Sequence, residues 1–218
     1  MKYKCLLIDH DDTVVKSTEQ IHYKSFVEYL KIYFPQYADR YSLSDYIEKN
    51  FDIGLMGIFR DELSMSDEQI EEEGRFWDSF VRDRIPRIYE GLSEGLHRFA
   101  REGGIIAVSS HSTEKYILRD YEANGLPAPH KVYAWDLGED KRKPSAFAIE
   151  DLCRTYGFCP SDILVVDDSK VGAVMARAGG CPFAVASWAY DIPRISAEIM
   201  AVSDFHLSSP EELWKLIF

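Results

Sequence analysis

The sequence predicts an α/β protein with a doubly wound parallel sheet, a Rossmann-like core, and an inserted all-helical domain. Short apolar runs without polar alternation, most of them followed by a small or acidic residue, are typical of parallel strands covered on both faces. From residue 90 onward such runs alternate with helical patterns, as in doubly wound sheets. In residues 18–86, by contrast, apolar residues recur at helical spacing and no strand pattern is found.

The strands are predicted from five apolar runs, of which the third is the weakest. The runs cover residues 5–8, 105–108, 131–135, 163–166 and 182–186. At the ends of the four stronger runs stand Asp9, Ser109, Asp167 and Ser187. Each strong strand is therefore expected to end directly in a polar side chain.

Helices are predicted between the later strands, where apolar residues share one helical stripe and a glycine stops the pattern. The predicted helices cover residues 113–124 (N-cap Ser112, stop at Gly125), 145–156 (stop at Gly157) and 170–178 (stop at Gly179-Gly180). This alternation of strand and helix favours a parallel sheet with helices on both faces.

The early helical stretch is predicted to form a domain of its own. Its length of roughly 70 residues is within the range of a small domain. We therefore predict a core domain at residues 1–16 and 88–218 and a helical domain at residues 17–87. Its many Tyr and Phe side chains are interpreted as the core of a helix bundle.

Composition and charge exclude several classes of partner. The net charge of −12 argues against nucleic-acid and anionic-membrane partners, which favour basic surfaces. No apolar run approaches the roughly 20 residues that span a bilayer, or the about 7–15 of a signal-peptide core. The four cysteines form no CxxC pair and are interpreted as reduced thiols. We expect a cytoplasmic protein, either a monomer or a homodimer.

Polar side chains gather where the predicted strands end. In an open parallel sheet, ligands bind beyond the carboxyl ends of the strands, so residues far apart in sequence meet there. The candidate residues at this edge are Asp9, Asp11, Ser109, Ser110, Lys143, Asp167 and Asp168. The sequence thus predicts one pocket that contains carboxylates, hydroxyls and a lysine.

This set of side chains points to phosphoryl chemistry. Clustered carboxylates raise each other's pKa unless a cation neutralises them. Oxygen ligands without a His or Cys set select a hard ion, for which Mg²⁺ is the natural choice. A lysine and a hydroxyl beside it can hold phosphoryl oxygens. A carboxylate near phosphorus can act as a nucleophile, and a second one can act as acid and then base.

The same residues resemble the four motifs of the haloacid dehalogenase superfamily, in the family's order along the chain. The segments that carry the resemblance are Asp9-x-Asp11-x-Thr13-Val14, Ser109-Ser110, Lys143-Pro144 and Val166-Asp167-Asp168-Ser169. The helical insert resembles the cap of the phosphoglycolate phosphatase and β-phosphoglucomutase branch. The stretch DDSKVGAVMARAGG is also similar to that branch's EDSxxGxxAxxxAG.

The resemblance implies a role for each matching residue. Asp9 would attack phosphorus to form an aspartyl-phosphate. Asp11 would protonate the leaving oxygen and later deprotonate the hydrolytic water. Ser109 and Lys143 would bind the phosphoryl group, and Ser110 would contribute a backbone amide or a structural contact.

The resemblance also implies a Mg²⁺ site. Asp167 and Asp168 would hold the ion together with Asp9 and the backbone carbonyl of Asp11. The helical cap would close over the substrate and exclude bulk water, as lids commonly do.

Two positions depart from the family's pattern. Asp12 stands where glycine is usual, although it tolerates unusual φ/ψ less freely than glycine does. Lys16 stands where an aspartate is common. These departures bear on the substrate more than on the chemistry, and Asp12 itself is assigned no catalytic role.

Three histidines stand near the motifs. Alternation along an extended segment points His10 away from Asp9 and Asp11, so it is interpreted as structural. His22, in the insert, and His111, after the second motif, are candidates for contact with substrate.

The function expected from the sequence is a Mg²⁺-dependent phosphatase that acts on a small phosphorylated metabolite. A phosphomutase with the same aspartyl-phosphate is the main alternative, and a non-catalytic protein that binds a phosphorylated ligand is a further one. Dehalogenation is disfavoured because it needs no second acid such as Asp11. A phospho-accepting receiver domain is disfavoured because its acid pair comes first in the chain and its lysine last.

Overall fold

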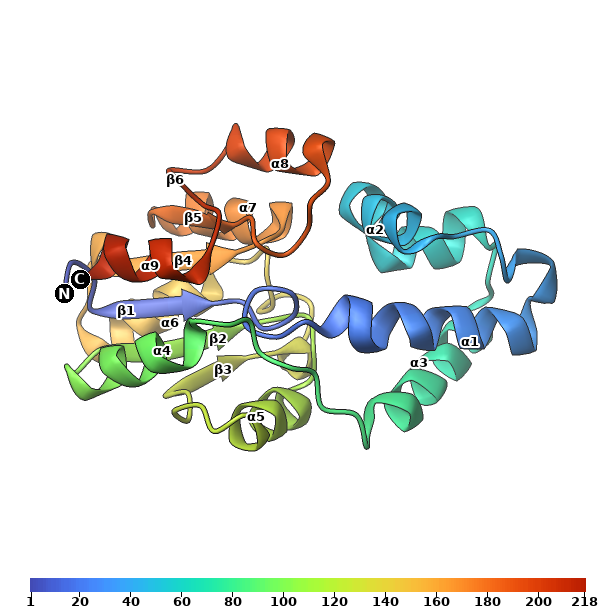
Figure 1. Ribbon diagram of the computed structural model, residues 1–218, viewed down its shortest axis with the longest axis horizontal. Helices are drawn as coiled ribbons and strands as arrows, with labels where there is room; N and C mark the ends of the chain where they lie inside the picture. The colour runs from blue at the N-terminus through green and yellow to red at the C-terminus, as the bar shows by residue number, and fades with distance from the viewer. The chain divides into compact units, whose positions relative to one another are not determined.

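The computed structural model describes all 218 residues, which form two compact units. Unit 1 comprises residues 1–16 and 87–218, and unit 2 comprises residues 17–86. Figure 1 labels the helices and strands along the chain. No helix is both long enough and apolar enough to cross a membrane.

Unit 1 is built on a six-stranded, all-parallel sheet, which confirms the predicted fold class. The strand order is β3-β2-β1-β4-β5-β6. The strands are β1 Cys5–Ile8, β2 Ile105–Ser109, β3 Lys131–Tyr133, β4 Ile163–Asp167, β5 Phe183–Ala186 and β6 Phe205–Leu207. The short edge strand β6 was not predicted, because only its last residue, Leu207, is buried.

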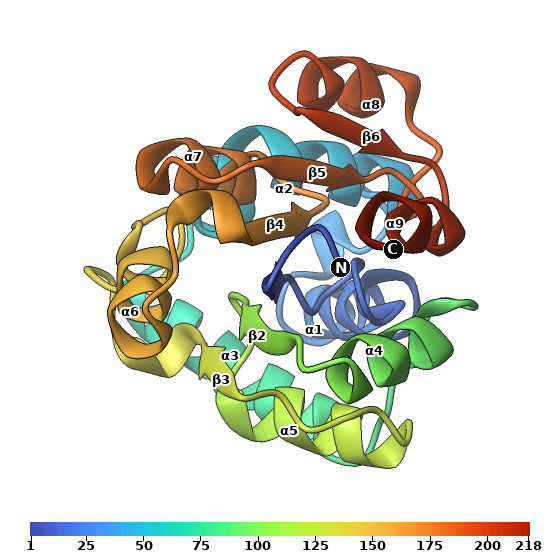
Figure 2. The same cartoon turned by 90° about the vertical axis from the view of Figure 1, so that its left-hand side faces the viewer.

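Helices cover both faces of this sheet. They are α4 Leu92–Arg101, α5 Glu114–Ala123, α6 Phe147–Tyr156, α7 Lys170–Gly179, α8 Pro193–Met200 and α9 Pro210–Ile217. On one face α4 packs against α9, and on the other α6 packs against α7 (Figure 2). The two termini meet at one end of the sheet, where the amide of Lys2 donates to the carbonyl of Ile217 over 2.8 Å.

Two local predictions were wrong. The third apolar run ends as a strand at Tyr133, and a single 3₁₀ turn over Trp135–Leu137 follows it. The N-cap of α5 is Thr113 rather than Ser112. Ser112 is engaged elsewhere, since its carbonyl accepts a hydrogen bond from the amide of Trp135 over 3.0 Å.

The order in which strands are added to the parallel sheet reverses at β1, in its centre. From β1 the chain adds β2 and β3 on one side, and β4 to β6 lie on the other. β1 is buried along its whole length. Ligands of open α/β sheets bind beside such a reversal, beyond the carboxyl ends of the strands.

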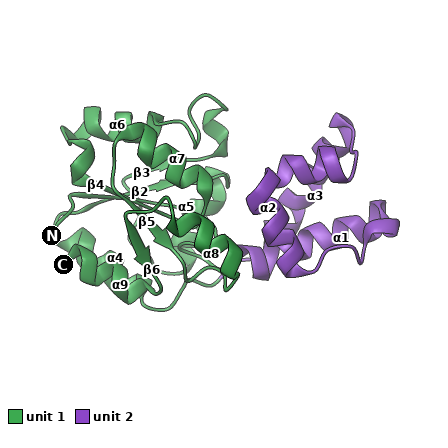
Figure 3. Cartoon of the chain, turned by 90° about the horizontal axis from the view of Figure 1, so that it is seen from above, with its two compact units in different colours: residues 1–16, 87–218 green, residues 17–86 purple.

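Unit 2 is helical, as the sequence predicts (Figure 3). Its helices are α1 Tyr23–Tyr33, α2 Leu43–Gly57 and α3 Asp67–Val81; a helical turn at Thr18–His22 precedes α1, and turns at Pro35–Tyr37 and Ile58–Glu62 join the three helices. Ser42 and Ser66 begin α2 and α3 with capping boxes. Gly54, at φ 70°, kinks α2.

Aromatic side chains form much of the core of unit 2, in agreement with the interpretation of its composition. Phe26 packs against Tyr46 with ring centroids 4.9 Å apart and against Tyr41 at 5.3 Å. Tyr29 packs against Phe76 at 5.5 Å. Ring pairs at these distances add stabilisation beyond the area that they bury.

The chain leaves unit 1 after Lys16 and returns to it at Arg87, and these two residues are joined by their backbones. The amide of Lys16 donates to the carbonyl of Arg87 over 2.8 Å. Val15 forms an antiparallel bridge with Ile88. The two ends of the 70-residue insert are therefore fixed beside each other within unit 1.

Candidate active site

Strand register places the acidic residues of the first and fourth motifs side by side. Ile8 pairs with Val108 on β2 and with Val166 on β4. Asp9, one residue further, continues the ladder through its amide, which donates to the carbonyl of Val166 over 2.8 Å. Asp167 is one residue beyond Val166, so Asp9 and Asp167 occupy equivalent positions on neighbouring strands.

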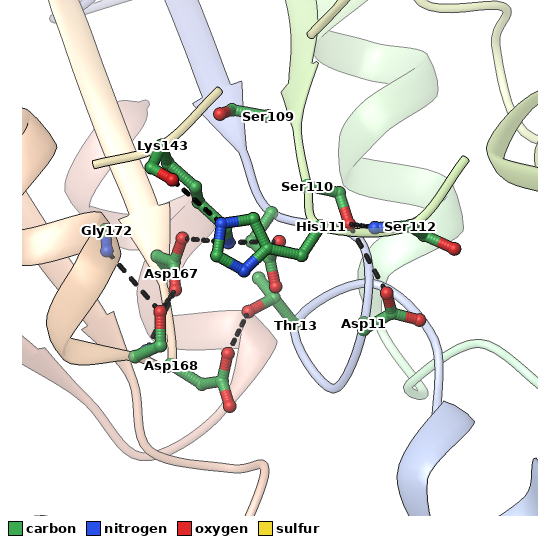
Figure 4. A network of polar contacts seen from close by, with 12 residues as sticks. Asp11, Thr13, Ser109, Ser110, His111, Ser112, Lys143, Asp167, Asp168 and Gly172 are labelled. Carbon is green, nitrogen blue, oxygen red and sulfur yellow. Dashed lines mark hydrogen bonds and ion pairs between the residues drawn. The ribbon is translucent and has the colours of Figure 1, made fainter. Parts of the chain in front are cut away.

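Lys143 lies between these two carboxylates, and Figure 4 shows it beside Asp167. Its Nζ donates to Oδ1 of Asp9 over 2.7 Å and to Oδ2 of Asp167 over 2.8 Å. All three residues are at least 95% buried, since the most exposed of them, Lys143, has 5% of its surface accessible. Charge-assisted hydrogen bonds of this kind are roughly twice as strong as neutral ones.

The carboxylates of Asp9, Asp167 and Asp168 form one cluster. Their nearest oxygen atoms all lie within 4.8 Å of one another. Thr13 donates its Oγ1 hydrogen to Oδ1 of Asp168 over 3.4 Å, which links the cluster to the turn after β1.

This cluster has the charge and ligand type of a site for a hard divalent cation. Burial raises the pKa of Asp9 well above its ordinary value; the ammonium of Lys143 opposes this effect and neighbouring carboxylates add to it. Desolvation, followed by the charges of Asp9 and Asp167, likewise raises the pKa of Asp168. With all three carboxylates ionised and the lysine protonated, the cluster has a net charge of −2. The atoms that could bind a metal are all oxygen, so the residues fit Mg²⁺.

Gly172, in the first turn of α7, allows the close approach of Asp167. A Cβ atom at this glycine would lie 2.3 Å from Cγ of Asp167. The amide of Ser169 donates to Oδ1 of Asp167 over 2.8 Å. The start of α7 thus fixes the Asp167 carboxylate on one side, while Lys143 holds it on the other.

Asp11 is held by the hydroxyl of Ser110. Oγ of Ser110 donates to Oδ2 of Asp11 over 3.3 Å, and the same Oγ accepts from the amide of Ser112 over 3.0 Å. Ser110 is 1% exposed, whereas Asp11 is half-buried. The structure therefore gives Ser110 a side-chain contact with the predicted acid/base.

Ser109 points its hydroxyl elsewhere. Its Oγ donates to Sδ of Met175, on α7, over 3.6 Å. Ser109 is the last residue of β2 and is 2% exposed. Its predicted contact with a phosphoryl group would need a rotation about χ1 and stays a prediction.

His111 contacts the lysine segment. Its Nε2 lies 2.8 Å from the carbonyl oxygen of Lys143, and its ring meets the ring of Trp135 edge to face at 5.8 Å. Although the side chain is exposed, the surrounding protein atoms and the Lys143 ammonium lower the pKa of His111. His111 is therefore predominantly neutral at pH 7, and its ring is fixed beside the backbone of the phosphate-binding candidate.

The other two histidines lie outside the carboxylate cluster. His10 is 1% exposed and its Nε2 lies 3.2 Å from Oδ2 of Asp120, on α5. This position agrees with the interpretation of His10 as structural. His22 belongs to unit 2, where its Nδ1 accepts a hydrogen bond from Nε1 of Trp77 over 3.1 Å. Its predicted contact with substrate stays a prediction.

Two residues that the sequence did not reveal contact the turn after β1. Oη of Tyr190 donates to Oδ2 of Asp12, and Nε1 of Trp188 donates to the carbonyl of Thr13 over 3.0 Å. Both lie in the loop that follows β5. The only signal in the sequence was the position of this loop after a strand, which it shares with many loops.

Comparison with known proteins finds one matching family and several relatives. The family described as "Haloacid dehalogenase-like hydrolase" matches residues 6–186. The phosphoglycolate phosphatase of Thiobacillus denitrificans is 28% identical over 116 residues, which cover 52% of this chain and 50% of the relative. The chain spans about half the length of the curated relatives that it matches first.

Solved structures share the fold over nearly the whole chain. A protein assigned as a haloacid dehalogenase-like hydrolase, from Bacteroides fragilis, has a TM-score of 0.79 at 18% identity, with 97% of this chain and 100% of that chain covered. CbbY from Rhodobacter sphaeroides, in complex with phosphate, has a TM-score of 0.73 at 18% identity, with 97% and 96% covered. At 18% identity, the similarity of these two structures to this chain shows that they share its fold.

Proposed function

The chain belongs to the haloacid dehalogenase-like hydrolase family, and on this premise we propose that it is a Mg²⁺-dependent phosphatase that acts through a phosphorylated Asp9. Its substrate would be a small phosphorylated metabolite. The observation that carries the proposal is the position of Lys143 Nζ between Asp9 and Asp167. A buried carboxylate held by a lysine, with further carboxylates within 4.8 Å, suits nucleophilic attack on a phosphoryl group better than a structural role.

Asp9, Asp167 and Asp168 would hold the Mg²⁺ ion. When bound, the ion supplies positive charge that neutralises the carboxylates and the phosphoryl oxygens. Lys143 adds a second positive charge from the protein itself. The carboxylates of Asp167 and Asp168 would serve as ligands of the ion without themselves reacting.

The reaction proposed for these residues has two steps. In the first, a carboxylate oxygen of Asp9 bonds to phosphorus while the bond from phosphorus to the ester oxygen breaks. The carboxyl group of Asp11 gives its proton to that leaving oxygen. In the second, the Asp11 carboxylate takes a proton from water, the water oxygen bonds to phosphorus, and the bond to Asp9 breaks. Inorganic phosphate leaves, and both carboxyl groups return to their starting states.

Ser110 supports this role for Asp11. Its hydroxyl contacts one oxygen of the Asp11 carboxylate, and the amide of Ser112 fixes that hydroxyl in turn. Because the carboxyl group is planar, the contact to Oδ2 of Asp11 also fixes the direction of Oδ1. A general acid held in one rotamer transfers its proton more efficiently than a mobile one.

The names of the related proteins support a small phosphorylated substrate. Relatives are named phosphoglycolate phosphatase, and CbbY was solved in complex with phosphate and, in a mutant form, with xylulose-(1,5)bisphosphate. Unit 2 is proposed to act as the cap, with His22 on the substrate side, and His111 is proposed to contact substrate from unit 1.

The test is release of inorganic phosphate from phosphorylated sugars, short acids and nucleotides, each with Mg²⁺ and with EDTA. We expect turnover with Mg²⁺ that EDTA abolishes, and a loss of at least about 10³-fold in kcat for Asp9→Asn. Asp140→Asn, at an exposed position, is the matched control and should leave kcat unchanged. An Asp9→Asn variant with the rate of the native protein would contradict the mechanism. Little phosphate release together with a requirement for a bisphosphate activator would identify a phosphomutase instead.

A further inference from the structure

The turn after β1 contains an aspartate in a backbone conformation that favours glycine. Asp12 has φ 59°, and Ser64 is the one other non-glycine residue with positive φ. Side chains with a Cβ atom adopt this left-handed region at an energetic cost that glycine avoids, although Asp and Asn tolerate it better than most. The carboxylate of Asp12 should therefore contribute something that a glycine could not.

The contact that glycine would lack is with the loop after β5. Oδ2 of Asp12 accepts a hydrogen bond from Oη of Tyr190, and Asp12 is 4% exposed. The same loop reaches the turn a second time, through the bond from Nε1 of Trp188 to the carbonyl of Thr13. The ring of Trp188 also packs edge to face on Tyr89, with centroids 6.4 Å apart.

This turn carries the predicted acid/base. The amide of Asp12 donates to the carbonyl of Val15 over 2.7 Å, and the amide of Val14 donates to the carbonyl of His10 over 2.9 Å. Asp11 lies within this closed loop of backbone bonds. Its carboxylate accepts a hydrogen bond from the hydroxyl of Ser110. The position of its Cα depends on how the turn itself is held.

We propose that Asp12 and Tyr190 are positioning residues, whose hydrogen bond holds the turn so that Asp11 transfers its proton in the correct geometry. The proposal rests on the proposed phosphatase function. It explains why an aspartate can replace glycine here: the side chain anchors the turn to the loop after β5, in exchange for the less favourable backbone conformation. Neither residue needs to touch substrate for this role.

The test compares Asp12→Gly, Asp12→Asn and Tyr190→Phe. We expect Asp12→Gly and Tyr190→Phe each to lower kcat about tenfold with little change in KM, because each removes the hydrogen bond that holds the turn. Asp12→Gly should keep or raise the thermal midpoint, since glycine adopts the positive φ at lower energetic cost. If the contact were purely structural, its loss would lower both kcat and the thermal midpoint. The double variant, with both Asp12→Gly and Tyr190→Phe, should lose no more kcat than either single variant, because the two residues form one hydrogen bond.

Asp12→Asn separates the contact from the charge. Asparagine tolerates positive φ and offers an amide oxygen to Tyr190, so this variant should keep at least about half of kcat. If it is as slow as Asp12→Gly, the charge of Asp12 matters rather than the hydrogen bond, and the proposal is overturned. Multiplicative losses in the double variant would overturn it as well. Tyr156→Phe, which removes a tyrosine hydroxyl on α6, is the matched control.

Amide hydrogen exchange tests the positioning without any turnover. Tyr190→Phe should accelerate exchange at residues 11–15 and leave β4 unchanged, whereas Tyr156→Phe should change neither. If the native protein released no phosphate from any substrate, the proposed function would be wrong. Hydrogen exchange would still show whether the bond between Asp12 and Tyr190 holds the turn. Unchanged exchange at residues 11–15 in Tyr190→Phe would refute it.

Discussion

The ammonium of Lys143 lies 2.7 Å from Oδ1 of Asp9, although 134 residues separate the two in the chain. Both side chains are 4% exposed. Burial alone would lower the pKa of Lys143, but the carboxylates of Asp167 and Asp9 outweigh it and raise that pKa above its ordinary value. The lysine is therefore charged, and it neutralises part of a buried acidic cluster.

Replacing this lysine should destabilise the protein in a way that Mg²⁺ partly reverses. Lys143→Met leaves buried carboxylates unpaired, so the free energy of unfolding should fall by about 3 kcal/mol in EDTA. Because the ion supplies the missing charge, Mg²⁺ should raise the thermal midpoint of this variant more than that of the native protein. Lys141→Met, at an exposed lysine, is the control. Equal effects of the two substitutions, measured by thermal unfolding, would contradict this account.

Gly172→Ala should disturb Asp167. Alanine is the better helix former by about 1 kcal/mol, but the added Cβ would meet Cγ of Asp167 at 2.3 Å. We expect the clash to dominate, with a lower thermal midpoint and a Mg²⁺ requirement for activity raised by about tenfold or more. Gly74→Ala in α3 has no atom within 4 Å of the new Cβ and should stabilise instead. Opposite signs for the two variants in one thermal scan are the expected result.

The two neighbouring serines should have different kinetic effects. Ser110→Ala removes the contact to Asp11 and should lower kcat about tenfold. Ser109→Ala removes a group that is proposed to contact the phosphoryl oxygens, so it should chiefly weaken competitive inhibition by inorganic phosphate. Steady-state kinetics with phosphate as inhibitor would measure both. If Ser109→Ala were inhibited by phosphate as strongly as the native protein, the Ser109 hydroxyl would not contact the phosphoryl group. Its contact with Met175 would then be the one described for it.

Glu73 should make the stability of the protein fall between about pH 4.5 and 7. Burial raises the pKa of Glu73 to about 7 from 4.5, and the charge of His22 opposes this. In that window the unfolded chain has released its proton and the folded chain has not, so the free energy of unfolding decreases as pH rises. The decrease should total about 3 kcal/mol and be complete above about pH 7.

Chemical denaturation at several pH values would measure this slope. Glu73→Gln should remove most of it and be more stable than the native protein at about pH 8. Glu71→Gln, on the exposed side of the same helix, should leave the slope unchanged. A native slope in Glu73→Gln would show that another group is responsible.

The fold could be predicted from sequence because its strands are buried on both faces. Runs such as the one in β4 carry no polar alternation, which is typical of parallel strands covered on both faces, and the helical patterns between the runs support this assignment. β6 was missed because it is three residues long and its middle residue, His206, is exposed. Ser112 was wrongly assigned as an N-cap because sequence does not show where the helix begins among neighbouring hydroxyl residues, and the backbone of Ser112 bonds instead to Ser110 and Trp135.

The members of the acidic cluster could be predicted because each is the last residue of a strand or directly follows one. The contacts of Tyr190 and Trp188 could not, since they join the loops after β5 and β1, and loop conformation depends on packing rather than on periodicity. The same reason applies to Ser109 and Ser110. Their order in sequence does not determine which hydroxyl turns toward Asp11.

The backbone hydrogen bond between Lys16 and Arg87 and the bridge between Val15 and Ile88 have a consequence for how such proteins evolve. These two links fix the spacing between the two ends of unit 2, whatever lies between those ends. The entropy of closing a loop grows only slowly with its length, by about 0.6 kcal/mol per doubling. If unit 2 is the cap proposed above, an insertion, deletion or exchange within residues 17–86 would thus change the surface that contacts the substrate at little cost to unit 1. Selectivity and bond-breaking chemistry can then diverge separately in descendants of this chain.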